Sequence, residues 1–270
     1  MEKIKNEIIE HFRKYLLWET AFSYAGWEDI EVYIGNTLSA AWLKGRPEDA
    51  YKFQDIRFKK MVNSARGKWL EKQSVNDTYK VIISTERCHD LNDMVRTYVH
   101  ELRHCLDYQN AVRDLRFEEY ELGNKFYLDW SEYRASMADT RYEFYQLLNE
   151  NKEISDNTVF YILSGMLGRR SADAVVGLMN NKENIRNIRY YISRYVGSSR
   201  AIRNLNMEFG EISEVFHLWN MMPVYIDELY NMTFYLGNEW DELEICKLNQ
   251  APSTYYYEEF LKTISTTQQG

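Results

Sequence analysis

The chain has 270 residues, of which 45% are hydrophobic, and this is enough for one large domain or two small ones with a real core. Its net charge of −8 argues against broad nucleic-acid binding, since phosphate contacts need basic patches. No apolar run approaches the roughly 18 residues of a membrane span, and the polar start is unlike a secretory signal. Three dispersed cysteines (Cys88, Cys105 and Cys246) favour reduced thiols, so we predict a cytoplasmic location.

The first predicted elements are a helix followed by strands. The opening segment carries apolar residues at helical spacing: Ile4, Ile8, Ile9, Phe12, Leu16 and Leu17. The period then changes, and residues 30–34, 37–43 and 55–61 are predicted to be strands. Residues 79–84 form the clearest strand, which we expect to be an edge strand that could bind an extended substrate. The alternative is an interior strand, because three consecutive apolar residues also suit a strand buried on both faces.

The most informative pattern is His100-Glu101-Leu102-Arg103-His104, which reads H-E-x-x-H. It falls in a predicted helix that Asp90 or Asn92 can cap and whose apolar stripe comprises Val95, Tyr98, Val99, Leu102, Cys105 and Leu106. Residues four apart share one helix face, so the two imidazoles, expected to be partly buried, can bind one tetrahedral zinc ion. Glu101 then lies beside the metal's water and can accept its proton.

A catalytic zinc usually has three protein ligands, so a third must come from elsewhere. The metzincin pattern would need Gly and His where this chain has Asp107 and Asn110. The best candidate is Glu132, 28 residues after His104, on a second helix that follows a turn near Gly123. Asp139 lies two turns further along and could accept a hydrogen bond from a zinc-bound imidazole. Competing ligands are Glu118, Glu119, Glu121 and Asp139 itself; alternatively, Glu132 could belong to a capping box begun by Asp129.

A family resemblance follows from these residues. The motif with Cys105-Leu106-Asp107 after it, and Glu132-Tyr133-Arg134-Ala135 on a later helix, resembles the gluzincins, in particular small bacterial and phage domains related to the anthrax lethal factor catalytic domain. The resemblance implies zinc bound by His100, His104 and Glu132, with Glu101 as general base for hydrolysis of a peptide or protein substrate. It also implies an α+β fold with a zincin-like core over residues 1–150. Tyr127 or Tyr133 is a candidate to stabilise the oxyanion.

The remainder of the chain is predicted to be helical. After a polar break at 149–157, apolar residues recur at helical spacing in residues 158–167, 172–179, 185–195 and 207–236. We expect residues 151–270 to form a helical subdomain that packs on the core and restricts the substrate. Arg186, Arg189 and Arg194, with nearby tyrosines, could form a basic, aromatic face, although a solvated helix side is the commoner outcome. The alternative function is therefore a non-catalytic zinc protein that binds protein or nucleic acid through this half.

Overall fold

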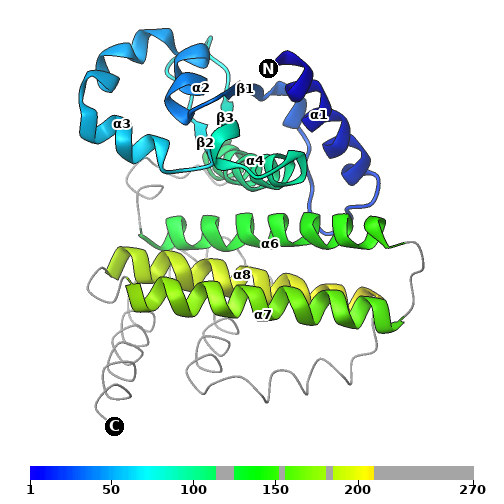
Figure 1. The fold of residues 1–270 in the computed structure, drawn as a ribbon. Helices are drawn as coiled ribbons and strands as arrows, with labels where there is room; N and C mark the ends of the chain where they lie inside the picture. The colour runs from blue at the N-terminus through cyan, green and yellow to red at the C-terminus, as the bar shows by residue number, and fades with distance from the viewer. Residues whose placement is uncertain (114–124, 152–155, 181–184, 210–270) are drawn as a thin grey trace, which may run out of the picture. The chain divides into compact units, whose positions relative to one another are not determined.

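The computed structural model describes residues 1–113, 125–151, 156–180 and 185–209 (Figure 1). The chain forms two compact units, Met1–Gln109 and Asn110–Gly270. The first contains a small three-stranded sheet with helices, and the described part of the second is helical, so the predicted α+β class is confirmed. The predicted domain boundary at residue 150 falls inside the second unit, and it stays a prediction. Among the described helices, none has the length and apolar character needed to cross a bilayer.

The first unit contains the predicted opening helix and the predicted motif helix. Its elements in chain order are α1 (Glu2–Leu16), β1 (Glu31–Gly35), α2 (Leu38–Gly45), α3 (Ile56–Asn63), β2 (Gly67–Leu70), β3 (Lys80–Ser84) and α4 (Leu91–Arg113), with short 3-10 turns at Trp27–Asp29, Pro47–Gln54 and Thr85–Arg87. The predictions of α1, β1, β3 and α4 are thus confirmed.

Two predicted strands are helices instead. Residues 37–43 were expected to be extended, but Thr37 caps α2 by accepting a hydrogen bond from the Ala40 N–H at 3.2 Å. Residues 55–61 belong to α3, where the Asp55 carboxylate accepts from the amides of Arg57 and Phe58. In both cases a side-chain cap begins a helix only eight residues long, and so short a segment shows little periodicity of its own.

The strand order is β1-β3-β2, with β1 parallel and β2 antiparallel to β3. All five residues of β3 are buried, so this strand lies in the middle of the sheet. The prediction that residues 79–84 form the edge is therefore wrong, and the alternative of an interior strand is correct. The physical reason is that the apolar side chains of Val81, Ile82 and Ile83 alternate between the two faces, and both faces are covered. The antiparallel edge strand is β2.

Helices cover the two faces of this sheet. Leu70 and Ile82 point to one face, where they pack in a cluster with Leu38 and Trp42 of α2 and Val62 of α3. Gly67 lies three residues before Leu70 but two before Trp69, so it shares the opposite face with Trp69, and there it contacts α4. On that side the rings of Phe12 in α1 and Tyr98 in α4 meet edge to face, with centroids 5.1 Å apart. The helix that carries the histidine motif is therefore packed against the sheet beside its β2 edge.

The described part of the second unit contains three long helices, α6 (Lys125–Glu150), α7 (Asp156–Asn180) and α8 (Ile185–Phe209), which run alongside one another (Figure 1). Helix α8 packs on both α6 and α7. A Cβ at Gly197 would lie 2.1 Å from the carbonyl oxygen of Tyr133, so glycine permits the close approach of α8 to α6. The predicted helical segments at 158–167, 172–179 and 185–195 are confirmed. Gly123 and nearly all of 207–236 lie outside the described residues.

Candidate metal centre

His100 and His104 lie one turn apart on α4, and both side chains are partly buried, as predicted. Their Nε2 atoms are 3.1 Å apart, and the ring planes are inclined at 81°. Two imidazole nitrogens bound at about 2.05 Å to one tetrahedral zinc ion stand roughly 3.3 Å from each other. The converging nitrogens therefore have almost the separation that one shared metal ion requires.

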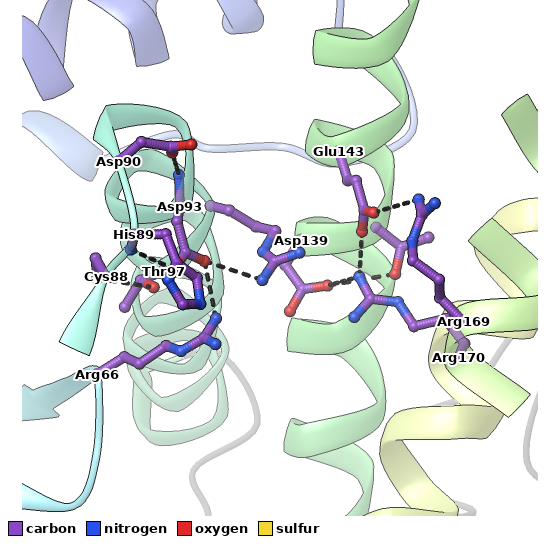
Figure 2. Close-up of polar contacts among 12 residues, drawn as sticks. Arg66, Cys88, His89, Asp90, Asp93, Thr97, Asp139, Glu143, Arg169 and Arg170 are labelled. Atoms are coloured by element: carbon purple, nitrogen blue, oxygen red, sulfur yellow. Dashed lines mark hydrogen bonds and ion pairs between the residues drawn. The ribbon is translucent and has the colours of Figure 1, made fainter. Parts of the chain in front are cut away.

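The start of α4 is fixed by carboxylates. Asp90 accepts a hydrogen bond from the Asp93 N–H at 2.8 Å, which confirms Asp90 as the predicted cap. The Asp93 carboxylate in turn accepts from Arg66 at 2.8 Å, from Arg96 at 3.0 Å and from the backbone N–H of His89 at 3.1 Å (Figure 2). Acidic groups at a helix N-terminus also interact favourably with the helix dipole. The first turn that leads to the histidines is thus anchored on several sides.

A buried ion pair joins Arg103 of the motif to Asp107, one helical turn further along α4. Arg103 and Asp107 are each 1% exposed, and Arg103 Nη2 lies 2.6 Å from Asp107 Oδ1. Arg103 Nη1 also donates to the carbonyl of Ser23 at 2.8 Å. Sequence reasoning missed this role, although Arg and Asp four residues apart on a helix are a recognisable pair. The pair ties α4 to the loop before β1 and so fixes which face of the helix presents the histidines.

Cys105 is fully buried, as expected for a packing residue next to His104. Its burial raises the pKa of the thiol to about 12, which keeps it protonated. Both described cysteines, Cys88 and Cys105, are buried free thiols. Neither thiol therefore offers a ready thiolate for metal binding or for chemistry.

Glu101 is held against the edge strand. Its Oε2 accepts a hydrogen bond from the backbone N–H of Trp69 at 3.1 Å. A Cβ at Gly67 would lie 2.9 Å from Cγ of Glu101 and 2.6 Å from Cγ2 of Thr97. The strand therefore approaches α4 closely at the residue that the motif assigns as general base. No sequence pattern indicated β2, because four residues are too few to show alternation.

The backbone groups of β2 alternate in direction. The backbone carbonyl of Arg66, just before β2, accepts from the Ser84 N–H at 2.8 Å, so the backbone groups of Arg66 point towards β3. Two residues later, those of Lys68, in register with Ile82, point the same way. The N–H and C=O groups of Gly67 and Trp69 therefore face away from β3. The Trp69 ring packs on Tyr108 of α4, with centroids 4.8 Å apart. Within the described parts of the chain no further strand pairs with β2, and this edge lies beside the helix that carries both histidines and Glu101.

In the second unit, Glu132 is a buried residue of α6. Asp129 lies inside the same helix, which begins at Lys125, so the alternative that Asp129 caps a helix start is wrong. Arg194 Nε of α8 lies 3.5 Å from Glu132 Oε1, and the Arg194 guanidinium lies 5.4 Å from the centroid of the Tyr190 ring. Arg194, proposed from sequence as part of a basic surface, is thus engaged with the candidate ligand.

Asp139 belongs to a cluster of charged side chains between α6 and α7. Its Oδ1 lies 3.4 Å from Arg170 Nη2 and accepts from the Thr140 hydroxyl at 3.3 Å. Glu143 pairs with Arg170 at 2.5 Å and with Arg169 at 2.9 Å (Figure 2). These contacts account for the burial of the Asp139 carboxylate. Its predicted hydrogen bond to a metal-bound imidazole stays a prediction.

Of the two tyrosines proposed to stabilise the oxyanion, only the side chain of Tyr133 is described. Tyr133 is buried, which raises the pKa of its hydroxyl to about 12. Glu118, Glu119, Glu121 and His217 lie outside the described residues, as do the side chains of Tyr127, Arg186 and Arg189.

No protein-family model, curated protein or solved structure matches this chain. A functional assignment therefore depends on the chemistry of the side chains themselves.

Proposed function

We propose that the protein is a zinc-dependent peptidase of the gluzincin type. The observation that carries the proposal is the pair of converging Nε2 atoms of His100 and His104, 3.1 Å apart on one face of α4, with Glu101 between them in the chain. Glu132 is proposed as the third ligand. Two imidazoles and one carboxylate are a donor set that could hold a metal ion, and this combination is typical of catalytic zinc.

The proposed reaction is hydrolysis of a peptide bond. When bound, zinc polarises the scissile carbonyl and lowers the pKa of the attacking water. Glu101 accepts a proton from that water as its oxygen bonds to the carbonyl carbon. As the C–N bond breaks, Glu101 gives the proton to the leaving amine, so the carboxylate is regenerated for the next cycle.

The edge strand supports a peptide as the substrate class. An extended chain can add to a sheet edge through backbone hydrogen bonds while its side chains occupy pockets. The outward groups of β2 offer the N–H and C=O of Gly67 and the C=O of Trp69 for this pairing, next to Glu101. We assign substrate binding to β2 in place of residues 79–84. The order of α1, the mixed three-stranded sheet and the motif helix α4 also supports the proposal of a zincin-like core.

The helices beyond residue 150 are proposed to restrict access and select the substrate, since the proposed ligands and base all precede them. Buried free thiols at Cys88 and Cys105 favour a reducing compartment, and we propose a cytoplasmic location. The alternative, a binding module built on a basic face of α8, is weakened because Arg194 pairs with Glu132 within the unit.

Metal analysis tests the ligands. Purified protein reconstituted with zinc and dialysed should retain close to one zinc ion, and His104→Ala or Glu132→Ala should lose most of it. His89→Ala is the matched control, because His89 is an exposed histidine just before α4. Wild-type protein that retains no zinc would overturn the proposal, and loss in His104→Ala alone would reassign the third ligand.

Proteolysis tests the base. Cleavage of a diverse peptide library, read by mass spectrometry, should fall by about 10²–10⁴-fold in Glu101→Gln, since a general base is removed. Zinc content should remain at the wild-type level, which separates loss of the base from loss of the metal. Equal cleavage by both proteins would assign the chemistry elsewhere.

A further inference from the structure

We infer that the edge strand β2 positions the general base: the Trp69 backbone N–H holds one oxygen of Glu101, and Gly67 provides the space that this contact needs. The inference rests on the proposed function. Trp69 N lies 3.1 Å from Glu101 Oε2, and the two residues are 32 positions apart in the chain. Trp69 and Gly67 are positioning residues, because neither takes part in proton transfer.

The direction of the Trp69 amide follows from the strand register. Trp69 pairs with Val81 at a position where the backbone groups point away from β3. Such an amide normally faces solvent or another strand, as edge groups do. Here it donates to a carboxylate instead, and a charge-assisted hydrogen bond of this kind is stronger than one between neutral groups. The contact therefore orders the Glu101 side chain before any substrate arrives.

Gly67 makes this approach possible. Any larger residue would place its Cβ 2.9 Å from Glu101 Cγ and 2.6 Å from Thr97 Cγ2, closer than side-chain atoms normally come. Alanine there would have to move β2 away from α4 or displace Glu101. The glycine thus sets the distance between the strand and the base.

Two consequences follow for the reaction. With Oε2 on the Trp69 amide, Oε1 is the atom that takes the proton, so the carboxylate works in one orientation. The Trp69 N–H is also withheld from the substrate. A peptide added to β2 therefore pairs through Gly67 and the Trp69 carbonyl, and this fixes its register against Glu101.

Amide hydrogen exchange tests the contact without any assay of activity. In the full-length protein, the Trp69 amide should exchange at least about tenfold faster in Glu101→Ala than in wild type, because its acceptor is gone. The Lys68 amide, which faces β3, should be unchanged and serves as the internal control. An unchanged Trp69 rate would overturn the inference while leaving the peptidase proposal intact. Absence of zinc binding would overturn the peptidase proposal while leaving the contact in place.

Kinetics test the positioning role. Trp69→Pro removes the N–H but no ladder bond with β3, and Trp69→Ala removes the same ring while keeping the N–H. We expect kcat of Trp69→Pro to be about 10–100-fold below that of Trp69→Ala, with KM and zinc content similar, since misplacing a catalytic group has effects of this size. Equal kcat values in the two variants would overturn the role.

A second set of variants covers the case in which proline disturbs the fold. Gly67→Ala should lower kcat through the contacts with Thr97 and Glu101. Adding Thr97→Ser, which removes the nearer of the two clashing atoms, should restore part of the loss. Thr97→Ser alone is the control and should leave kcat unchanged. Wild-type kcat in Gly67→Ala would contradict the inference.

Discussion

Helices α4 and α6 carry the proposed ligands, and they are stabilised by different kinds of contact. Around α4, key side chains bond to backbone: Glu101 to the Trp69 N–H, Arg103 to the Ser23 carbonyl and Asp93 to the His89 N–H. Around α6, the corresponding contacts join side chains of neighbouring helices, including Glu132 with Arg194. These three contacts of the first unit thus depend on the course of the main chain, whereas the contact of Glu132 with Arg194 in the second depends on matched charges.

The difference has a practical meaning for mutation. A backbone partner is present whatever side chain the partner residue carries, so a contact to it depends on one side chain. A charged pair depends on two side chains, and losing either leaves a charge behind. Substitutions around α6 should therefore be coupled more strongly than substitutions around α4. Charged pairs also occur in the first unit, as between Arg66 and Asp93, and the buried Arg103–Asp107 pair offers the sharpest test.

The largest effect is expected for Arg103→Met. Both partners are 1% exposed, so the variant leaves the Asp107 carboxylate buried without its guanidinium. We expect the free energy of unfolding to fall by about 3–5 kcal/mol, measured by urea denaturation. The double variant Arg103→Met/Asp107→Leu is the control and should recover much of the loss. A fall below about 1 kcal/mol for the single variant would show that this buried pair does not anchor α4.

A smaller loss is expected for Gly197→Ala in the second unit. The new Cβ would lie 2.1 Å from the Tyr133 carbonyl oxygen, which forces α8 away from α6. Overpacking of this kind costs about 1–3 kcal/mol in the free energy of unfolding. The Glu132–Arg194 pair should loosen with it, and zinc affinity should fall.

Gly168→Ala provides a control of opposite sign. Gly168 lies on α7, and a Cβ there would meet no atom within 4 Å. Alanine should therefore stabilise the helix by up to about 1 kcal/mol, because it has the higher helix propensity. If Gly197→Ala and Gly168→Ala changed the free energy of unfolding in the same direction and by the same amount, helix propensity and not the α6–α8 contact would explain both changes.

The cap of α4 should contribute about 1 kcal/mol. Asp90→Ala removes the acceptor of the Asp93 N–H, and the loss of such a cap lowers stability by roughly 0.5–2 kcal/mol. Asp90→Ser keeps a capping oxygen and should stay close to wild type in thermal unfolding. An equal loss in both variants would indicate that the charge of Asp90, and not its hydrogen bond, matters.

The smallest effect concerns acid stability and Asp77. Desolvation by itself would raise the pKa of this carboxyl, but hydrogen bonds from Lys80 and from the Gln73 and Thr78 amides outweigh it and lower the pKa to about 2. A lowered folded-state pKa adds stability that is present above the unfolded value of 3.8 and is lost as the pH falls towards 2. Since the side chain is partly exposed, the contribution should be on the order of 1 kcal/mol.

Denaturant unfolding of Asp77→Asn at several pH values measures this contribution. The stability difference from wild type should be full above about pH 4 and should shrink as the pH falls towards 2. Asp29→Asn, at an exposed position, is the control. A difference that stays constant over this range would exclude a role for ionised Asp77.

The sequence by itself determined the elements whose pattern is local and long. The stripe along α1 and α4 predicted both helices, and the spacing of His100 and His104 placed their nitrogens together, because four residues make about one helical turn. Three consecutive apolar residues in β3 were compatible with its central position. The long helices α7 and α8 also followed from periodicity, which covers several turns in each.

Only the tertiary structure decided the rest, because the deciding contacts join residues far apart in the chain. Two short segments became α2 and α3 once their caps and their packing against the sheet were in place. Glu101 meets Trp69 across 32 positions and Arg103 meets Ser23 across 80. Arg194 meets Glu132 through the packing of α8 on α6. Local periodicity reports which face of an element is apolar, but it does not report which element that face meets.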